Sequence, residues 1–149
     1  MEEKIFNAHL DIYKPNKKKT GGAIRFVFSK EAKTIFLEGA TQVGEMRDKK
    51  VFDWENRKVI FAIKTNDIFL IRSFLRMKAS AREEEPLKIY HKFLKDGVET
   101  STVLNIANGR NGFYLSMMQG DNKVGVPVTS GEMECVNDLF RVYIYKIYG

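Results

Sequence analysis

The chain has few of the residues that carry most disulfide, metal and acid-base chemistry. It holds one cysteine, Cys135, and two histidines, His9 and His91, among 149 residues. A single cysteine excludes an intrachain disulfide framework and any multi-thiolate metal site, and it suits a reducing compartment. Both histidines fall at strand positions far apart, and neither is at metal-ligand spacing from a second ligand-rich cluster. We expect paired or solvent-facing strand histidines, with no metal and no cofactor.

Long apolar runs are missing too. No stretch approaches the roughly 20 apolar residues of a membrane span. The first six residues, MEEKIF, are acidic and quickly become strand-like, so neither a signal peptide nor a basic transit peptide is visible. These patterns predict a soluble, cytoplasmic protein with no membrane partner.

Catalytic motifs are not found either. Residues 17–22 (KKKTGG) lack the G-x-x-x-x-G-K-[ST] order of a phosphate loop and favour a basic hairpin loop. Asp53 and Glu55 form a local carboxylate pair, which we interpret as ion-paired to Arg57 or Lys58 and not as an acid and base. The sequence therefore predicts that the protein is not an enzyme.

What the sequence does contain is one phrase that occurs twice. Residues 58–67 (KVIFAIKTND) and 123–132 (KVGVPVTSGE) each carry an alternating apolar strand into a hydroxyl residue followed by an acid, at a constant offset of 65. The pattern predicts hydroxyl N-caps, Thr65 and Ser130, with an acid in the first helical turn, where amide dipoles favour negative charge. It indicates a duplicated unit of strands followed by a helix.

Alternating apolar residues predict four strands and one helix in each half. The first half has expected strands at 6–12, 24–28, 34–40 and within 51–64, where 55–57 fits either a hairpin turn or a bulge, and a helix at 66–77. The second half has expected strands at 87–93, 98–106, 113–119 and 123–128, then a helix that begins with a capping box if Thr129 is the cap. The order is ββββα repeated, with residues 79–86 as the linker.

One domain is expected over residues 1–149, with halves of about 4–79 and 86–149. A chain with 44% apolar and 12% aromatic content is long enough for one well-buried core and short for two. Its fold class is α+β.

The charge balance permits a polyanionic partner. The chain has 25 Lys and Arg against 19 Asp and Glu, a net charge of +6, and several lysines crowd one loop. Aromatic and basic residues also share positions that strands would leave to solvent, a mixture that suits stacking of unpaired bases beside phosphate contacts. The alternative for each aromatic is a core position, and Trp54 could equally pack at a subunit interface. The candidate nucleic-acid-binding residues are Tyr13, Lys14, Lys17, Lys18, Lys19, Arg25, Phe52, Trp54, Arg57, Lys58, Tyr90 and Lys92.

Three segments, in the right order and spacing, resemble the Whirly proteins, single-stranded-DNA-binding proteins best known in plants. They are residues 6–14 (FNAHLDIYK), 51–63 (VFDWENRKVIFAI) and 126–132 (VPVTSGE), against a family pattern of S-I-Y-K, Y-D-W-x-R-K-Q-V-F and I-P-V-T. The chain departs from that pattern after Lys14, where its loop is longer and more basic. Without plant-type tails, it looks more like a bacterial or phage relative.

The resemblance implies two antiparallel four-stranded sheets with helices packed between and after them. It also implies a homotetramer with a helical core, in which single strands thread along sheet edges between subunits. The related mitochondrial guide-RNA-binding proteins and positive-cofactor-four-type coactivators share that plan, so RNA stays open. The leading expectation is sequence-tolerant binding of single-stranded DNA in replication, recombination or repair. The alternatives are an RNA-binding or RNA-annealing protein, or a structural oligomer that binds no nucleic acid.

Overall fold

The computed structural model describes residues 9–148, in which the two halves follow each other along the chain. The expected first strand began at residue 6, so its start lies outside the described residues. The first half contains β1 (His9–Lys14), β2 (Gly22–Ser29), β3 (Thr34–Thr41), β4 (Val59–Ile63) and α2 (Thr65–Arg76). The second half follows α3 (Ala79–Glu84) and contains β5 (Leu87–Lys95), β6 (Val98–Gly109), β7 (Gly112–Gln119), β8 (Asn122–Thr129) and α4 (Ser130–Tyr148).

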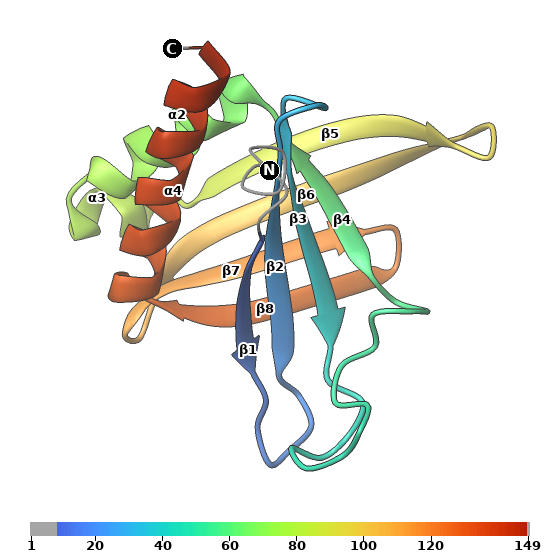
Figure 1. Ribbon diagram of the computed structural model, residues 1–149. Helices are drawn as coiled ribbons and strands as arrows, with labels where there is room; N and C mark the ends of the chain where they lie inside the picture. The colour runs from blue at the N-terminus through green and yellow to red at the C-terminus, as the bar shows by residue number, and fades with distance from the viewer. Residues whose placement is uncertain (1–8, 149) are drawn as a thin grey trace.

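Each half forms one antiparallel meander. The strand orders are β1-β2-β3-β4 and β5-β6-β7-β8, which confirms the α+β fold with two antiparallel four-stranded sheets. The two sheets cross face to face, and α2 and α4 lie together at one side of them (Figure 1). The apolar core fills the space between the sheets and these helices.

The sheets approach closely at a glycine of β3. A Cβ on Gly39 would stand 2.5 Å from Met117 Cε and 3.2 Å from the Val124 side chain, both on the second sheet. The missing side chain therefore lets the two sheets pack at this crossing. Any larger residue would push the sheets apart or displace Met117.

Helix α2 begins one residue earlier than expected, and α4 begins where the Thr129 capping box places it. Lys64 is the N-cap of α2, and its backbone N–H donates to Asp67 Oδ2 at 2.9 Å. In the second copy the Thr129 N–H donates to Glu132 Oε1 (2.9 Å) while the Glu132 N–H donates to Thr129 Oγ1 (3.1 Å). The predicted capping box at Thr129 is confirmed, and the caps keep the offset of 65. Thr65 and Ser130, expected as caps, are the first helical residues instead. In a capping box the acid lies three residues after the cap, so Asp67 and Glu132 select the residues just before Thr65 and Ser130 as the caps.

The expected strand within residues 51–64 is confined to β4. Residues 42–58 form a loop with one internal bridge, between Gln42 and Phe52, and the Asp53 N–H of this loop donates to the Thr41 carbonyl of β3 at 2.9 Å. Asp53 ends the extended backbone, since its Oδ1 accepts the Asn56 N–H at 3.1 Å and folds the chain into a turn. Residues 54–56 form a turn and not a bulged strand, but the turn is not that of a hairpin, because β4 pairs with β3. The equivalent connection in the second half, between β7 and β8, is only Gly120 and Asp121.

The linker at residues 79–86 contains a helix, α3. Arg82 fixes it to the second sheet, because its Nε donates to Asn108 Oδ1 at 3.0 Å and its Cζ lies 5.0 Å from the Phe113 ring centroid. Asn108 Nδ2 in turn donates to the Ala79 carbonyl at 2.7 Å. The segment's alanines and glutamates are strong helix formers, which explains a helix in place of an extended linker.

Candidate nucleic-acid interface

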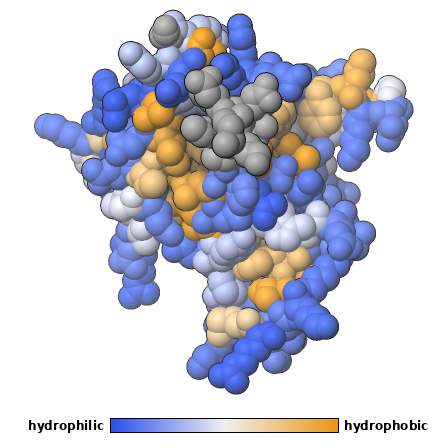
Figure 2. All heavy atoms as spheres, in the orientation of Figure 1, coloured by the Kyte–Doolittle hydropathy of each residue, from blue (hydrophilic) through white to orange (hydrophobic). Residues whose placement is uncertain are grey.

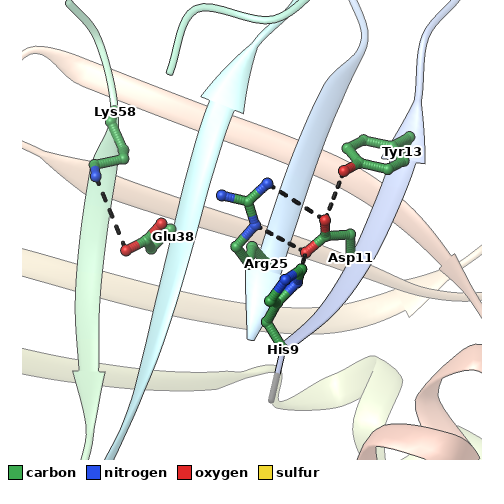
Figure 3. Close-up of polar contacts among 6 residues, drawn as sticks. All are labelled: His9, Asp11, Tyr13, Arg25, Glu38 and Lys58. Carbon is green, nitrogen blue, oxygen red and sulfur yellow. Dashed lines mark hydrogen bonds and ion pairs between the residues drawn. The ribbon is translucent and has the colours of Figure 1, made fainter. Parts of the chain in front are cut away.

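The outer face of the first sheet carries a row of polar residues. Alternation along the strands turns Asp11, Arg25 and Glu38 away from the second sheet, and the register places them directly opposite one another on β1, β2 and β3. Two residues further along β1, Tyr13 points to the same side. Figure 3 shows these side chains across the sheet.

Asp11 organises its neighbours. Arg25 donates from Nε to Asp11 Oδ1 at 2.9 Å and from Nη2 to Oδ2 at 3.3 Å, and the Tyr13 hydroxyl donates to Oδ2 at 2.6 Å (Figure 3). His9 Nδ1 lies 3.0 Å from Asp11 Oδ1. Burial raises the pKa of Asp11, but the hydrogen bonds from Arg25, Tyr13 and His9 outweigh it and lower that pKa to about 2. The hydrogen bond that the Tyr13 hydroxyl donates to Asp11 raises the pKa of Tyr13. Arg25 and Tyr13 are thus held in fixed positions.

This network predicts a pH-dependent stability. Asp11 has a lower pKa folded than unfolded, where 3.8 applies, so its stabilisation is complete above about pH 5 and is lost as the pH falls towards 2. The Asp11→Asn variant should be less stable than the parent by about 1–2 kcal/mol at pH 6. Urea unfolding of both proteins between pH 6 and pH 2 measures the gap, which should close on acidification. A gap that stays constant would remove Asp11 as its cause.

An aromatic hollow lies beside this row, at the end of the sheet that carries the long loops. It has a volume of about 540 Å³ and is lined by Tyr13, Lys49, Lys50, Val51, Phe52, Trp54 and Glu55. The Tyr13 and Phe52 rings stack with centroids 5.8 Å apart and an interplanar angle of 20°. The guanidinium of Arg25 lies 4.7 Å from the Trp54 ring centroid. One end of the sheet therefore presents three aromatic rings and their neighbouring cations together.

Gln42 ties the two loops of this end to each other. Its Oε1 accepts the backbone N–H of Asn16 (2.9 Å) and of Gly21 (3.2 Å), both in the β1–β2 loop. Its Nε2 donates to the carbonyls of Asn16 (3.0 Å) and Gly44 (2.9 Å). Because Gln42 is only 5% exposed, these bonds are protected from water and hold the basic loop against the loop that carries Trp54. Figure 2 shows that this tip of the molecule is largely hydrophilic.

The structure gathers four of the expected site residues, Tyr13, Arg25, Phe52 and Trp54, around the hollow. The expected lysines Lys17, Lys18 and Lys19 are exposed on the adjoining β1–β2 loop, where Lys19 Nζ is 3.9 Å from Glu45 Oε1. Two more of the expected site residues, Lys58 and Arg57, border the same face. Lys58 Nζ lies 3.9 Å from Glu38 Oε2, and Arg57 is exposed at the end of the β3–β4 loop.

Three expected site residues lie elsewhere. Lys14 faces the start of α4, where its Nζ pairs with Glu132 Oε1 at 2.8 Å. Tyr90, 63% exposed, and Lys92 belong to β5 and lie on the outer face of the other sheet. Lys92 Nζ is 3.5 Å from Glu99 Oε1 there. These three do not contribute to the aromatic hollow.

Two lysines that sequence reasoning missed line the hollow. Lys49 and Lys50 stand just before the Phe-Asp-Trp segment, and a basic pair next to an aromatic-Asp-Trp motif was the available signal. Lys50 Nζ lies 3.6 Å from Asp53 Oδ1 and 3.8 Å from Glu55 Oε2. The expected pairing of these two carboxylates with Arg57 or Lys58 is wrong, because the turn at residues 54–56 folds them back towards Lys50.

Both histidines have acidic partners in the structure, His9 with Asp11 and His91 with Asp67. Among residues 9–148, no group of three or more His, Cys, Asp or Glu side chains could hold a metal ion. Within the same range, no helix is long and apolar enough to cross a membrane.

No known family model matches the chain, and no curated protein matches it. Among solved structures, the chain is similar to MRP1/MRP2 from Trypanosoma brucei, with a TM-score of 0.65 and 11% sequence identity. The superposition covers 99% of this chain and 90% of that one. The likeness extends over the whole fold, both sheets and the helices included. The resemblance to Whirly proteins stays a prediction from the sequence.

Proposed function

We propose that the protein binds single-stranded DNA, without catalysis and with little preference for base sequence. The observation that carries this proposal is the aromatic hollow, in which Tyr13, Phe52 and Trp54 lie beside Arg25, Lys49 and Lys50. Rings of this kind stack on unpaired bases of any identity, while lysines and arginines meet the phosphates. Replication, recombination and repair are the processes that expose such strands.

The basic loops around the hollow support a path for the phosphate backbone. Lys17 in one loop and Arg47 in the other line a second hollow of about 310 Å³, continuous with the tip that Gln42 holds together. The bound strand would pass from these cations to the rings. Partial neutralisation by Glu45 and Glu55 leaves the tip with an excess of positive charge.

A gel-shift panel tests the proposal. Matched single-stranded DNA, single-stranded RNA and duplex DNA of the same length are titrated at several salt concentrations. We expect strong preference for single strands, because stacked bases in a duplex cannot reach the rings, and a logarithmic salt slope of about −0.7 per phosphate neutralised. Equal affinity for duplex and single strand would leave only non-specific charge attraction, and tighter binding of RNA would change the substrate to RNA.

We further propose a homotetramer that assembles through its helices. The described part of α4 buries Val136, Phe140 and Tyr143 within the subunit, yet leaves Tyr145 73% and Tyr148 60% exposed. The neighbouring helix α2 also exposes two large apolar side chains, Phe69 and Leu70. An apolar surface shared by two packed helices is typical of a subunit interface.

Light scattering at micromolar concentration should report a tetramer, and the double variant Phe69→Lys/Tyr145→Lys should dissociate it. The lysines remove apolar area and introduce like charges where copies meet, while neither position belongs to the buried core. A matched control is Tyr90→Lys, which places the same change on an exposed strand position. A monomeric parent protein would refute the assembly. A tetramer that binds no nucleic acid would favour a structural oligomer.

A further inference from the structure

A cleft separate from the aromatic hollow lies where the two sheets diverge. The β5–β6 hairpin projects past the edge strand β4 (Figure 1), and the space between them has a volume of about 650 Å³. We call it the edge cleft. Its walls include Ile60 and Ala62 of β4 on one side and His91, Phe93 and Thr102 of the hairpin on the other. A volume of this size suits a nucleotide-sized ligand.

The floor of the edge cleft is flat and aromatic. The His91 ring stacks on Phe61 with centroids 4.7 Å apart and an interplanar angle of 24°. Asp67 fixes the imidazole, since its Oδ2 lies 2.6 Å from His91 Nε2. Phe93 and Leu94 remain 37% and 75% exposed, and apolar surface shows on the projecting hairpin (Figure 2). The cleft therefore offers ring faces to a planar ligand.

Two polar groups in the edge cleft lack partners. Thr102 is 2% exposed, and its Oγ1 has no hydrogen-bond partner. Buried hydroxyls are normally satisfied, so the Thr102 hydroxyl is free to hydrogen-bond a ligand in this cleft. Gln119 uses its Oε1 to accept the Ile60 N–H at 3.2 Å, and its amide N–H groups make no bond to residues 9–148. Together they supply a hydroxyl and a donor for the hydrogen-bonding edge of a base.

The charges around the edge cleft select an anion. Lys64 and Lys95 line it, and no carboxylate does. Lys64 Nζ donates to Thr34 Oγ1 at 2.9 Å, and this neutral partner leaves the charge of Lys64 uncompensated. Lys95 has no ion pair among residues 9–148. An occupant with a flat apolar body, polar edge atoms and a negative charge satisfies all of these groups.

We propose that the edge cleft takes one unpaired base of the bound single strand, stacked near Phe93 and hydrogen-bonded to Thr102, with its phosphate on Lys95. This inference rests on the proposed function, because it assumes that the strand is nucleic acid. It adds a second contact point, on the opposite edge of the first sheet from β1, and so lengthens the path of the strand across one subunit.

Thr102→Val tests the hydrogen bond, with Ser101→Ala on the opposite face of β6 as the matched control. Valine keeps the shape of threonine and removes an unsatisfied hydroxyl, so the melting temperature should stay the same or rise. Affinity for single-stranded DNA should fall by roughly 3- to 10-fold, as expected for the loss of one hydrogen bond. Ser101→Ala should change neither quantity.

Photocrosslinking locates the base directly. Oligothymidylate in which 5-iodouracil replaces some thymines should crosslink, on irradiation, to the peptide that contains Phe93, and Phe93→Leu should abolish that crosslink. Unchanged affinity of Thr102→Val, with all crosslinks in the segment that carries Phe52 and Trp54, would overturn the edge-cleft proposal and leave the proposed function standing. Absence of any binding by the parent protein would overturn both. A change of oligomeric state in Thr102→Val would show that a second copy of the chain occupies the cleft, and would refute the proposal that the cleft binds a base.

Discussion

Replacing Asp67 by alanine should lower the free energy of unfolding by about 2–4 kcal/mol, a larger loss than any other single carboxylate here should cause. The Asp67 side chain is 6% exposed and accepts the Lys64 N–H at 2.9 Å. It also holds His91 at 2.6 Å, and so joins the first helix to the second sheet. Its removal leaves two partly buried groups without partners.

The duplication supplies a matched control. Glu132 occupies the equivalent position 65 residues later, but its side chain is 32% exposed and its partner Lys14 is 27% exposed. Water can replace both contacts, so Glu132→Ala should cost about 1 kcal/mol, the usual cost of a lost cap. Urea unfolding at pH 7 of the two variants measures the difference. Equal losses would show that burial does not distinguish the two caps.

The two sheets could be predicted from the sequence because their strands alternate and their turns are marked. Asp96-Gly97, a tight-turn dipeptide, joins β5 to β6 with φ of 53° and 79°, values that this pair adopts at low cost. The constant offset of 65 likewise anticipated that each β-sheet is followed by a helix with an acid in its first turn. Local rules of this kind act within a few residues, so a sequence displays them.

The β3–β4 loop could not be predicted in the same way. Val51-Phe52-Asp53-Trp54 is rich in the β-branched and aromatic residues that favour strands, yet the Asp53 carboxylate accepts the Asn56 N–H and ends the extended backbone. Whether such a segment pairs with a neighbour depends on contacts far away in the sequence. Gln42 supplies them by bonding the β1–β2 loop, and nothing in its own neighbourhood marks it for that role.

Only part of the candidate site could be predicted, and the reason is again that its contacts join distant segments. The pairing of Tyr13 with Phe52 and of Arg25 with Trp54 joins a strand to a distant loop, which no local pattern contains. Lys14 is different, because strand alternation alone places it on the opposite face from Tyr13. Applied strictly, that rule would have separated Lys14 from the site.

Trp54→Ala should weaken binding of single-stranded DNA by about 1–3 kcal/mol, roughly 5- to 150-fold, with little change in the salt slope. One face of the indole is covered by Arg25 at 4.7 Å, so a base stacks on the other face or displaces the guanidinium. No phosphate contact is lost in either case. Because Trp54 is only half-buried, the melting temperature should fall little. Trp54→Phe keeps a ring and should retain most of the affinity.

The triple variant Lys17→Ala/Lys18→Ala/Lys19→Ala should behave in the opposite way, since these lysines are exposed and carry charge without a stacking surface. Its affinity should fall similarly for all base compositions, and its salt slope should become shallower by about 0.7 for each lysine that meets a phosphate. Fluorescence titrations of both variants at four salt concentrations, with melting temperatures from the same preparations, separate stacking from charge. If Trp54→Ala destabilises the fold strongly while each folded molecule binds as tightly as the parent, then Trp54 is a packing residue and the hollow binds through its other rings.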